Sequence, residues 1–234
     1  MKKIIVLTLG SCLIGVLLLL YFFFKDLKVV DPKTVKTNSL KGIDVSHHNQ
    51  IENWNTIKDS LDFIIIKATQ GANFKDPQFK NYWKSAKRHG LVRGAYHFFV
   101  PNVSAEKQFD NFKNSVNLSK GDLIPFLDVE DKNVNISEVN KWLDLAKKHY
   151  GVQPVIYSEY TFFKFFLNGK VNAESLWIYV DQKYDRQPTF KKYNCVFWQY
   201  SHQGNLHGIK GDIDLDMFID SVNTFSNYLI KKGI

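Results

Sequence analysis

Cysteine is scarce in this chain, and its scarcity excludes a disulfide framework. The 234 residues include two cysteines, and Cys12 lies within an apolar N-terminal run. Cys195 is then the single cysteine in the rest of the chain, so that part cannot form an internal disulfide bond. A domain of about 200 residues is large enough to be stable on its hydrophobic core alone.

The motifs of several common chemistries are also missing. His-x-x-x-His pairs and Cys/His clusters do not occur, and the adjacent His47 and His48 would point to opposite faces of a strand. Gly-x-Ser-x-Gly and the glycine-rich loops that hold phosphates or dinucleotides are absent too. We therefore expect no metal and no cofactor, and we expect the pair His47 and His48 to form a polar loop cluster that lines the functional site.

The charge pattern gives little support for nucleic-acid binding. The net charge is +8, and Lys2, Lys3 and Lys25 contribute three of these charges, which leaves +5 for the rest. Arginine-rich runs are absent, and the lysines are interspersed with acidic residues. A mild basic excess suits an anionic polymer such as a cell wall, and it is equally common in ordinary basic domains.

A long apolar run stands at the N-terminus. Ile4–Phe24 contains no charged residue over 21 positions, and as a helix it would span ~31 Å, close to the ~30 Å hydrocarbon core of a bilayer. The run ends in Tyr21-Phe22-Phe23-Phe24-Lys25, which offers no small-x-small cleavage site. The sequence predicts an uncleaved signal anchor, a transmembrane helix, over residues 1–25 and a lysine-rich tether over residues 26–40.

Two other interpretations of this run stay open. A cleaved signal peptide is the first, although its apolar core would be shorter than the run seen here. Lipidation is the second, because Leu9-Gly10-Ser11-Cys12 looks like a lipidation box. The apolar run continues for twelve residues past Cys12, which favours a membrane helix instead.

Beyond the tether, short β-rich runs alternate with helical stretches. The expected strands are Gly42–Ser46, Phe63–Thr69, Val92–Phe99, Leu123–Glu130, Pro154–Ser158, Leu176–Val180, Cys195–Ser201 and Ile213–Phe218. Helix signals are Asp76-Pro77 with a stop at Gly90, Ser104, and Ser137 with a stop before Gly151. This order predicts an α/β domain over residues 41–234, an irregular TIM-like barrel of about eight strands and five helices. An open doubly wound sheet is the alternative, because helices become rare after Leu176.

Acidic residues follow one of the predicted strands at a spacing of two. Asp128 and Glu130 end the run Leu123–Glu130, and side chains two apart on a strand point to the same face. In a barrel the carboxyl ends of the strands line the active site. Two such acids repel each other, so one is expected to keep its proton near neutral pH. A protonated acid beside a carboxylate is the arrangement that glycoside hydrolysis requires.

Other predicted strands carry acids in comparable places. Asp44 lies on the first strand and Asp214 on the last, and these two strands are neighbours in a closed barrel. Asp212 and Asp216 share the face of Asp214, so the pattern alone does not choose among the three. Aromatic side chains beside the acids suit sugar rings, although core packing explains about half of such residues. The aromatic candidates are Tyr96, His97, Tyr157, Tyr179, Trp198 and Tyr200.

Taken together, the motifs resemble those of the family 25 glycoside hydrolases, the muramidases. The matching segments are Lys41–His48, Phe63–Thr69, Gly94–Phe98, Asp128–Glu130, Ile156–Ser158, Leu176–Ile178, Trp198–Ser201 and Ile213–Asp216. Their order and spacing hold from about Lys41 to Phe218. Two positions depart from the family pattern: Gln70 stands where many members have Glu, and Tyr179 replaces a usual small residue.

The resemblance implies a helix-poor-ended, eight-stranded barrel that hydrolyses the β-1,4 bond after N-acetylmuramic acid in peptidoglycan. By position, Glu130 resembles the general acid and Asp128 its partner. The supporting residues implied by the matching motifs are Asp44, Asp214, Tyr96, Tyr157, Trp198 and Gln199. We expect Asp128 to orient the substrate's 2-acetamido group, while an inverting route through a water stays open.

Partners and location follow as expectations. The partners would be peptidoglycan glycan strands, and the membrane through the N-terminal helix, with the protein acting as a monomer in the bacterial cell envelope. The catalytic domain would lie outside the cytoplasm, anchored in the cytoplasmic membrane. A non-catalytic wall-binding module and a glycosidase that acts on chitin are the two rival functions.

Overall fold

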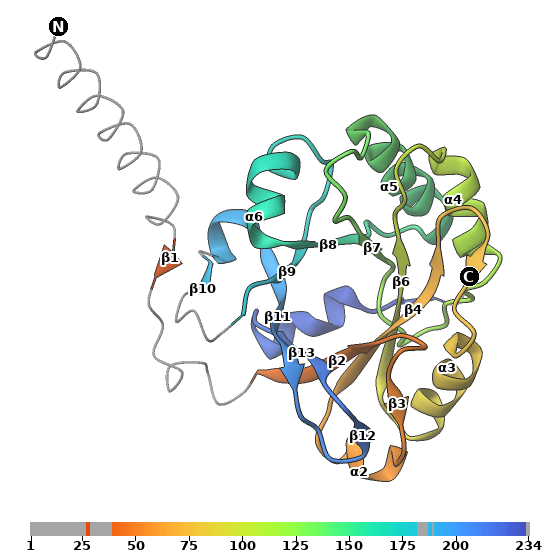
Figure 1. Cartoon of the computed structure of the whole chain (residues 1–234), viewed down its shortest axis with the longest axis vertical. Coiled ribbons are helices and arrows are strands. Elements are labelled where there is room, and N and C mark those ends of the chain that lie inside the picture. The colour runs from red at the N-terminus through yellow and green to blue at the C-terminus, as the bar shows by residue number, and fades with distance from the viewer. Residues whose placement is uncertain (1–26, 29–38, 182–186, 189, 233–234) are drawn as a thin grey trace, which may run out of the picture.

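Eight of the strands form a closed barrel (Figure 1). The computed structural model describes residues 27–28, 39–181, 187–188 and 190–232. The strands are β1 (Leu27–Lys28), β2 (Leu40–Val45), β3 (Gln50–Ile51), β4 (Phe63–Gln70), β5 (Phe74–Lys75), β6 (Val92–Phe98), β7 (Phe126–Asp128), β8 (Val155–Glu159), β9 (Leu176–Tyr179), β10 (Gln187–Pro188), β11 (Cys195–Gly204), β12 (Ile209–Lys210) and β13 (Ile213–Phe218). Each of the eight predicted strands is present.

The ring of strands closes without an open edge. Around the barrel the order is β2, β13, β11, β9, β8, β7, β6 and β4, and β4 pairs again with β2. The alternative of an open doubly wound sheet is therefore wrong. Seven neighbouring strands run parallel, whereas β13 runs antiparallel to both β11 and β2. The start of β13 thus lies at the same barrel end as the carboxyl ends of the other seven strands.

Helices cover the outside of the early part of the barrel (Figure 1). The helices of the described residues are α2 (Trp54–Lys58), α3 (Phe79–Arg88), α4 (Ala105–Lys113), α5 (Ile136–Tyr150), α6 (Tyr160–Phe162), the π-helix η2 (Phe163–Leu167), and the 3-10 helices η4 (Phe190–Tyr193) and η5 (Val222–Tyr228). Ser104 caps α4 as predicted, and Gly151 ends α5 with a φ of 69°. The α5 N-cap is Asn135 rather than Ser137, because the Asn135 side chain accepts from the Ser137 amide. Asp76 begins the turn before α3, two residues ahead of the N-cap Gln78.

The strand that leads to the acid pair is shorter than predicted. It was expected over Leu123–Glu130, but β7 spans Phe126–Asp128. Pro125 has no amide hydrogen to donate to a neighbouring strand. Of the two residues before it, Leu123 N donates to Arg93 O on β6, whereas Ile124 N donates to Tyr228 O, which is not on a neighbouring barrel strand. At its other end β7 stops at Asp128, so Glu130 lies in the loop after the strand.

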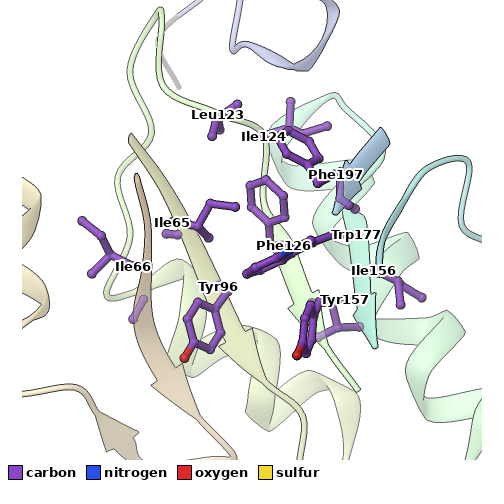
Figure 2. Packing of buried hydrophobic residues seen from close by; sticks show 14 of the residues in the cluster. Ile65, Ile66, Tyr96, Leu123, Ile124, Phe126, Ile156, Tyr157, Trp177 and Phe197 are labelled. Carbon is purple, nitrogen blue, oxygen red and sulfur yellow. The ribbon is translucent and has the colours of Figure 1, made fainter. Parts of the chain in front are cut away.

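Phenylalanine rings fill the barrel below its mouth (Figure 2). Phe126 contacts Phe197 edge to face at 5.4 Å between centroids, and Phe63 contacts Phe197 in the same manner at 5.6 Å. Gly42 lies beside Phe63 on the neighbouring strand, and an added Cβ there would be 2.2 Å from Phe63 Cε2. A glycine at this position gives the ring its space. The result is a dry floor beneath the polar residues of the mouth.

The predicted signal anchor, residues 1–25, lies outside the described residues. Within the segment predicted as a tether, β1 pairs with β10 in an antiparallel bridge of two residues on each side. In the described part of the chain, no helix is long and apolar enough to cross a membrane.

Replacing Gly42 by alanine should destabilise the barrel by about 1–3 kcal/mol, because the added methyl group would overlap the Phe63 ring. Urea unfolding would measure the loss. Gly94→Ala is the matched control, since its added Cβ would lie 3.0 Å from Phe126 Cε2 and require a smaller shift. Equal unfolding free energies for Gly42→Ala and the unchanged protein would contradict this account of the core.

Candidate active site

A cavity of about 380 Å³ opens at the mouth of the barrel. Four acidic residues from three sides of the ring line it: Asp44, Asp128, Glu130 and Asp214. Lys67, on β4, is the lysine among the described lining residues. Aromatic side chains form much of the remaining wall, namely Tyr96, Phe98, Tyr157, Trp177 and Tyr179. The predicted acids from separate strands therefore meet in one space.

Asp128 and Glu130 differ in burial although both face the cavity. Asp128 ends β7 and is 6% exposed, whereas Glu130 lies in the exposed loop just beyond. Val129 between them is buried and turned away, which keeps the two acids on one side. One oxygen of Asp128, Oδ1, is buried without a hydrogen-bond donor among the described residues. The site thus offers an acceptor to a bound molecule.

Both members of this pair hold protons more tightly than ordinary carboxyl groups. Burial and the charge of Glu130 raise the pKa of Asp128 well above its ordinary value, and Lys67 opposes the rise. Partial loss of hydration and the charge of Asp214 raise the pKa of Glu130. Because the two acids interact, they titrate together, and the free site holds a proton at pH values where isolated acids have lost theirs.

The seam between the first and last barrel strands brings a second set of acids together. Asp44 on β2 pairs directly with Asp214 on β13. This confirms the predicted proximity of the two strands. Burial, followed by the charges of Asp214 and Asp216, raises the pKa of Asp44 well above its ordinary value. Burial raises the pKa of Asp214 to about 6, while nearby His202 lowers it.

Asp216 lies one layer below the cavity. Its side chain is completely buried, and its Oδ1 accepts from Trp177 Nε1 at 2.8 Å. The sequence left Asp212, Asp214 and Asp216 equivalent on one face. The structure separates them, because Asp214 lines the cavity, Asp216 is enclosed and Asp212 is exposed.

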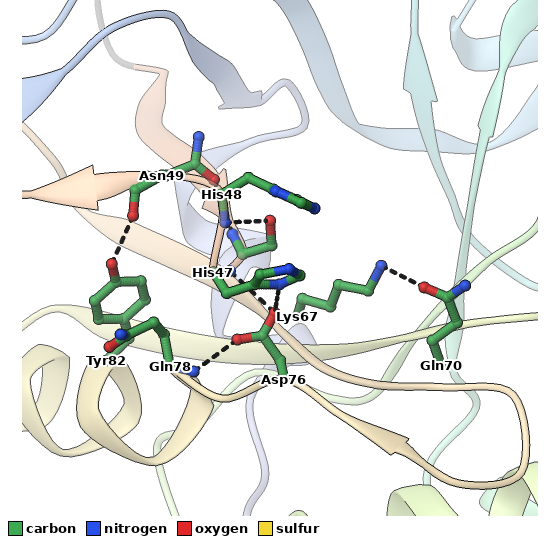
Figure 3. A network of polar contacts seen from close by, with 9 residues as sticks. His47, His48, Asn49, Lys67, Gln70, Asp76, Gln78 and Tyr82 are labelled. Atoms are coloured by element: carbon green, nitrogen blue, oxygen red, sulfur yellow. Dashed lines mark hydrogen bonds and ion pairs between the residues drawn. The ribbon is translucent and has the colours of Figure 1, made fainter.

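Lys67 carries the positive charge of the cavity wall. Its Nζ donates to Gln70 Oε1 at 2.8 Å (Figure 3) and lies 4.7 Å from the centroid of the Phe98 ring. Burial lowers the pKa of Lys67, and the charges of Asp128, Asp76 and Glu130 oppose that change. Gln70, which departs from the family pattern, therefore anchors the lysine through a neutral oxygen.

Tyr96, Tyr157 and Gln199 lie where the sequence motifs suggested. The two tyrosine hydroxyls point toward the same end of the barrel, away from the phenylalanine floor (Figure 2). Tyr157 donates to Gln199 Oε1 at 2.5 Å, and Gln199 Nε2 donates to Asp44 Oδ2 at 2.9 Å. This chain of hydrogen bonds fixes the amide of Gln199 and the hydroxyl of Tyr157 relative to Asp44.

Four predicted site residues lie outside the cavity lining, namely His47, His97, Trp198 and Tyr200. His47 stands in a turn, where its Nδ1 and backbone amide both contact Asp76 Oδ2 (Figure 3), and the adjacent His48 lines the cavity instead. Trp198 neighbours Gln199 on β11 and so faces the opposite side of the sheet, where its Nε1 donates to Val180 O at 2.9 Å.

Comparisons with known proteins agree with this geometry. The sequence profile of the glycosyl hydrolases family 25 matches residues 43–209. The chain belongs to glycosyl hydrolase family 25. The uncharacterized protein YegX of Escherichia coli (strain K12) is 32% identical over 220 residues, which cover 89% of this chain and 80% of that protein.

Relatives with lysozyme names extend the family likeness. Lysozyme M1 of Streptomyces globisporus is 30% identical over 203 residues, covering 78% of this chain and 68% of that protein. The crystal structure of the bacterial lysozyme from Streptomyces coelicolor has a TM-score of 0.73 at 27% identity, covering 83% of this chain and 98% of that one. The similarity thus extends over nearly the whole chain of the solved Streptomyces coelicolor lysozyme.

The cavity also contains residues that could not be identified from the ends of the predicted strands. Lys67, Trp177 and His202 line the cavity but were not proposed as site residues, whereas His48 lines it as a member of the predicted polar loop. Trp177 and Lys67 each lie two positions from another inward-facing residue of their strand, a period-2 signal that could have found them. Among the described residues, no group of three or more His, Cys, Asp or Glu side chains is arranged to hold a metal ion.

Replacing Asp214 by asparagine should stabilise the domain above about pH 6 while reducing its activity. The raised pKa means that the folded state holds this proton more tightly, so the related stability is complete at low pH and is lost as pH rises through about 6. Asparagine never ionises. Melting temperatures of the two forms should therefore converge near pH 4 and separate by about pH 8.

Asp212→Asn is the matched control, because Asp212 is exposed in the turn just before the same strand. Thermal melts would be recorded beside turnover for each variant. If Asp214→Asn melted below the unchanged protein at about pH 8, burial would not be the force that raises this pKa.

Proposed function

We propose that this protein is a lysozyme, an N-acetylmuramidase that hydrolyses the β-1,4 bond between N-acetylmuramic acid and N-acetylglucosamine in peptidoglycan. The observation that carries the proposal is the proton-holding pair Asp128 and Glu130 at the mouth of a family 25 barrel. Lysozyme M1, a relative at 30% identity, supports the choice of substrate.

Glu130 is the general acid in this proposal. It is the more exposed member of the pair, so a glycan strand that crosses the mouth can bring its glycosidic oxygen to the Glu130 carboxyl. Protonation of that oxygen allows the leaving sugar to depart as an alcohol. Burial and the charge of Asp214 raise the pKa of Glu130, so its carboxyl keeps the proton to higher pH than an ordinary glutamic acid.

Asp128 stabilises the reacting sugar from below. Its donor-free Oδ1 can accept the N–H of the substrate's 2-acetamido group, which turns the amide oxygen toward the anomeric carbon. That hydrogen bond also favours the ionised form of Asp128. Substrate binding therefore drives the shared proton toward Glu130, the residue that must donate it.

The aromatic wall and the amide of Gln199 suit a sugar. Tyr157 and Trp177 pack against each other with ring centroids 4.5 Å apart, so their faces stay fixed at the cavity wall. Such rings can pack against the C–H face of a pyranose while fixed polar groups bond its hydroxyls. The N-terminal apolar run would hold this domain at the outer face of the cytoplasmic membrane, within reach of its polymer.

Glu130→Gln should lower turnover of purified peptidoglycan by ~10²–10⁴-fold while the fold and glycan binding persist, because the amide keeps the shape but cannot donate the proton. Glu174→Gln makes the same chemical change at an exposed surface ion pair and should leave turnover unchanged. If Glu130→Gln kept more than a tenth of the activity, Glu130 would not be the general acid.

Mass spectrometry of the released fragments identifies the bond that is cut. N-acetylmuramic acid at the new reducing end supports a muramidase. N-acetylglucosamine there, or cleavage of chitin oligomers in place of peptidoglycan, would favour a different glycosidase. Glycan binding without any product would favour a non-catalytic wall-binding module.

Asp128→Asn should move the basic limb of the pH–rate profile to lower pH. The charge of Glu130 raises the pKa of Asp128, so the two carboxyls repel each other. Removing the charge of Asp128 should therefore let Glu130 lose its proton at lower pH. The maximum rate should fall as well, because the developing positive charge at the sugar loses its partner. Asp131→Asn removes a charge from the same loop outside the cavity lining and serves as the control. An unshifted basic limb in Asp128→Asn would mean that the two carboxyls act independently.

A further inference from the structure

Asp216 is a completely buried acid that the proposed reaction does not use. One of its oxygens, Oδ1, accepts from Trp177 Nε1, but Oδ2 has no donor among the described residues. The carboxyl group of Asp44 is within hydrogen-bonding reach of Asp216. Two ionised carboxylates in such contact, inside a dry barrel, would repel each other with no donor between them.

A single proton between the two acids resolves this conflict. We propose that Asp216 is a positioning residue: it holds the negative charge of a shared-proton pair and keeps Asp44 in its neutral form. Asp44 then donates its O–H to Asp216 Oδ2, the atom that otherwise lacks a donor. The inference deepens the proposed function, on which its kinetic part rests.

The donors and charges around the two acids favour the proton on Asp44. Tyr157 donates to Gln199, Gln199 donates to Asp44, and Trp177 donates to Asp216. The chain from Tyr157 ends at Asp44, and Trp177 is the donor to Asp216. The Trp177 N–H stabilises a charge on Asp216 itself. The charge of Asp214 opposes ionisation of both acids, whereas the charge of Asp128 opposes that of Asp44.

The strand geometry explains why these two acids meet. On β13, Asp216 lies opposite Gly42 of β2, and Asp44 is two residues further along β2 on the same face. The Phe63 ring fills the space beside Gly42, and the Asp44 carboxyl is a diagonal neighbour of Asp216 on β2. The groups that influence Asp44 come from three other strands: the charges of Asp214 and Asp216 on β13, the charge of Asp128 on β7 and the amide of Gln199 on β11.

A neutral Asp44 matters for the acid pair that performs the chemistry. The negative charge stays beneath the cavity floor, at Asp216, and not at the cavity wall where it would face Asp128. Asp128 can then ionise when substrate binds. The same network holds Trp177 and Tyr157 in place through their polar atoms, so the cavity wall keeps its shape.

Asp216→Asn tests the pair without changing the total charge. The asparagine Oδ1 can still accept from Trp177, while its Nδ2 donates to Asp44, which then ionises. The negative charge thus moves to the cavity wall, toward Asp128. We expect the acidic limb of the pH–rate profile to move upward by roughly one pH unit, because the new charge raises the pKa of Asp128. Asp212→Asn should leave the profile unchanged.

Carbon NMR of the full chain with labelled aspartate carboxyls gives a readout that needs no activity. One protonated aspartate signal should persist at about pH 8, above the pKa of Asp214. It should vanish in Asp216→Asn and in Asp44→Asn, and it should remain in Asp128→Asn. In Asp44→Asn the remaining acid of the pair is Asp216, which is ionised as Asp44 is in Asp216→Asn. The test therefore does not depend on the folding of a single variant.

Two results would overturn the inference. The first is the absence of a protonated signal at that pH, or its loss only in Asp128→Asn. The second is an Asp216→Asn enzyme whose rate falls while its acidic limb stays in place, as a merely structural residue would behave. If the chain cleaves no peptidoglycan at all, the NMR result still stands, so the two proposals fail separately.

Discussion

Burial of five carboxyl groups at one end of the barrel is the constraint on which the rest of the site depends. The groups are Asp44, Asp128, Glu130, Asp214 and Asp216, and each has a raised pKa. Burial is the largest cause in every case, which traces the effect to the phenylalanine layer beneath them. Lys67 compensates only part of the charge. Protons must therefore stay in the site near neutral pH, and acid catalysis requires such protons.

The reversed direction of β13 makes this gathering possible. A last strand that ran parallel to its neighbours would bring its carboxyl end, near Phe218, to the mouth. Because β13 is antiparallel, its first residues lie there instead, and Asp214 faces Asp44 across the seam. The next inward position, Asp216, is buried one layer down beside Trp177. One short strand thus supplies an acid to the cavity and another to the floor beneath it.

Much of this arrangement could be predicted from the sequence, because strand periodicity is local. Alternation along the chain identified all eight strands and placed Asp44 near Asp214. The side-chain network could not be predicted, since its hydrogen bonds join residues as far apart as Asp44 and Gln199. The sequence pattern did not predict the turn geometry either. A hydrogen bond to Asp76 holds His47 away from the cavity, which His48 lines. The later start of β7 depends on Pro125, which has no amide hydrogen. Its effect becomes clear only when the hydrogen-bond partners of Leu123 and Ile124 are known.

The two acid pairs differ in the donors available to them, and this difference divides their roles. Asp216 receives a permanent donor from Trp177, so the charge of the lower pair has a fixed position. Asp128 has an acceptor oxygen with no donor among the described residues, so the charge of the upper pair is settled only when a ligand supplies one. A pair with fixed protonation forms a stable floor, whereas a pair that responds to the substrate's own N–H delivers its proton after binding. In the proposed reaction, Glu130 therefore becomes an effective acid at the moment when the glycosidic oxygen is in place.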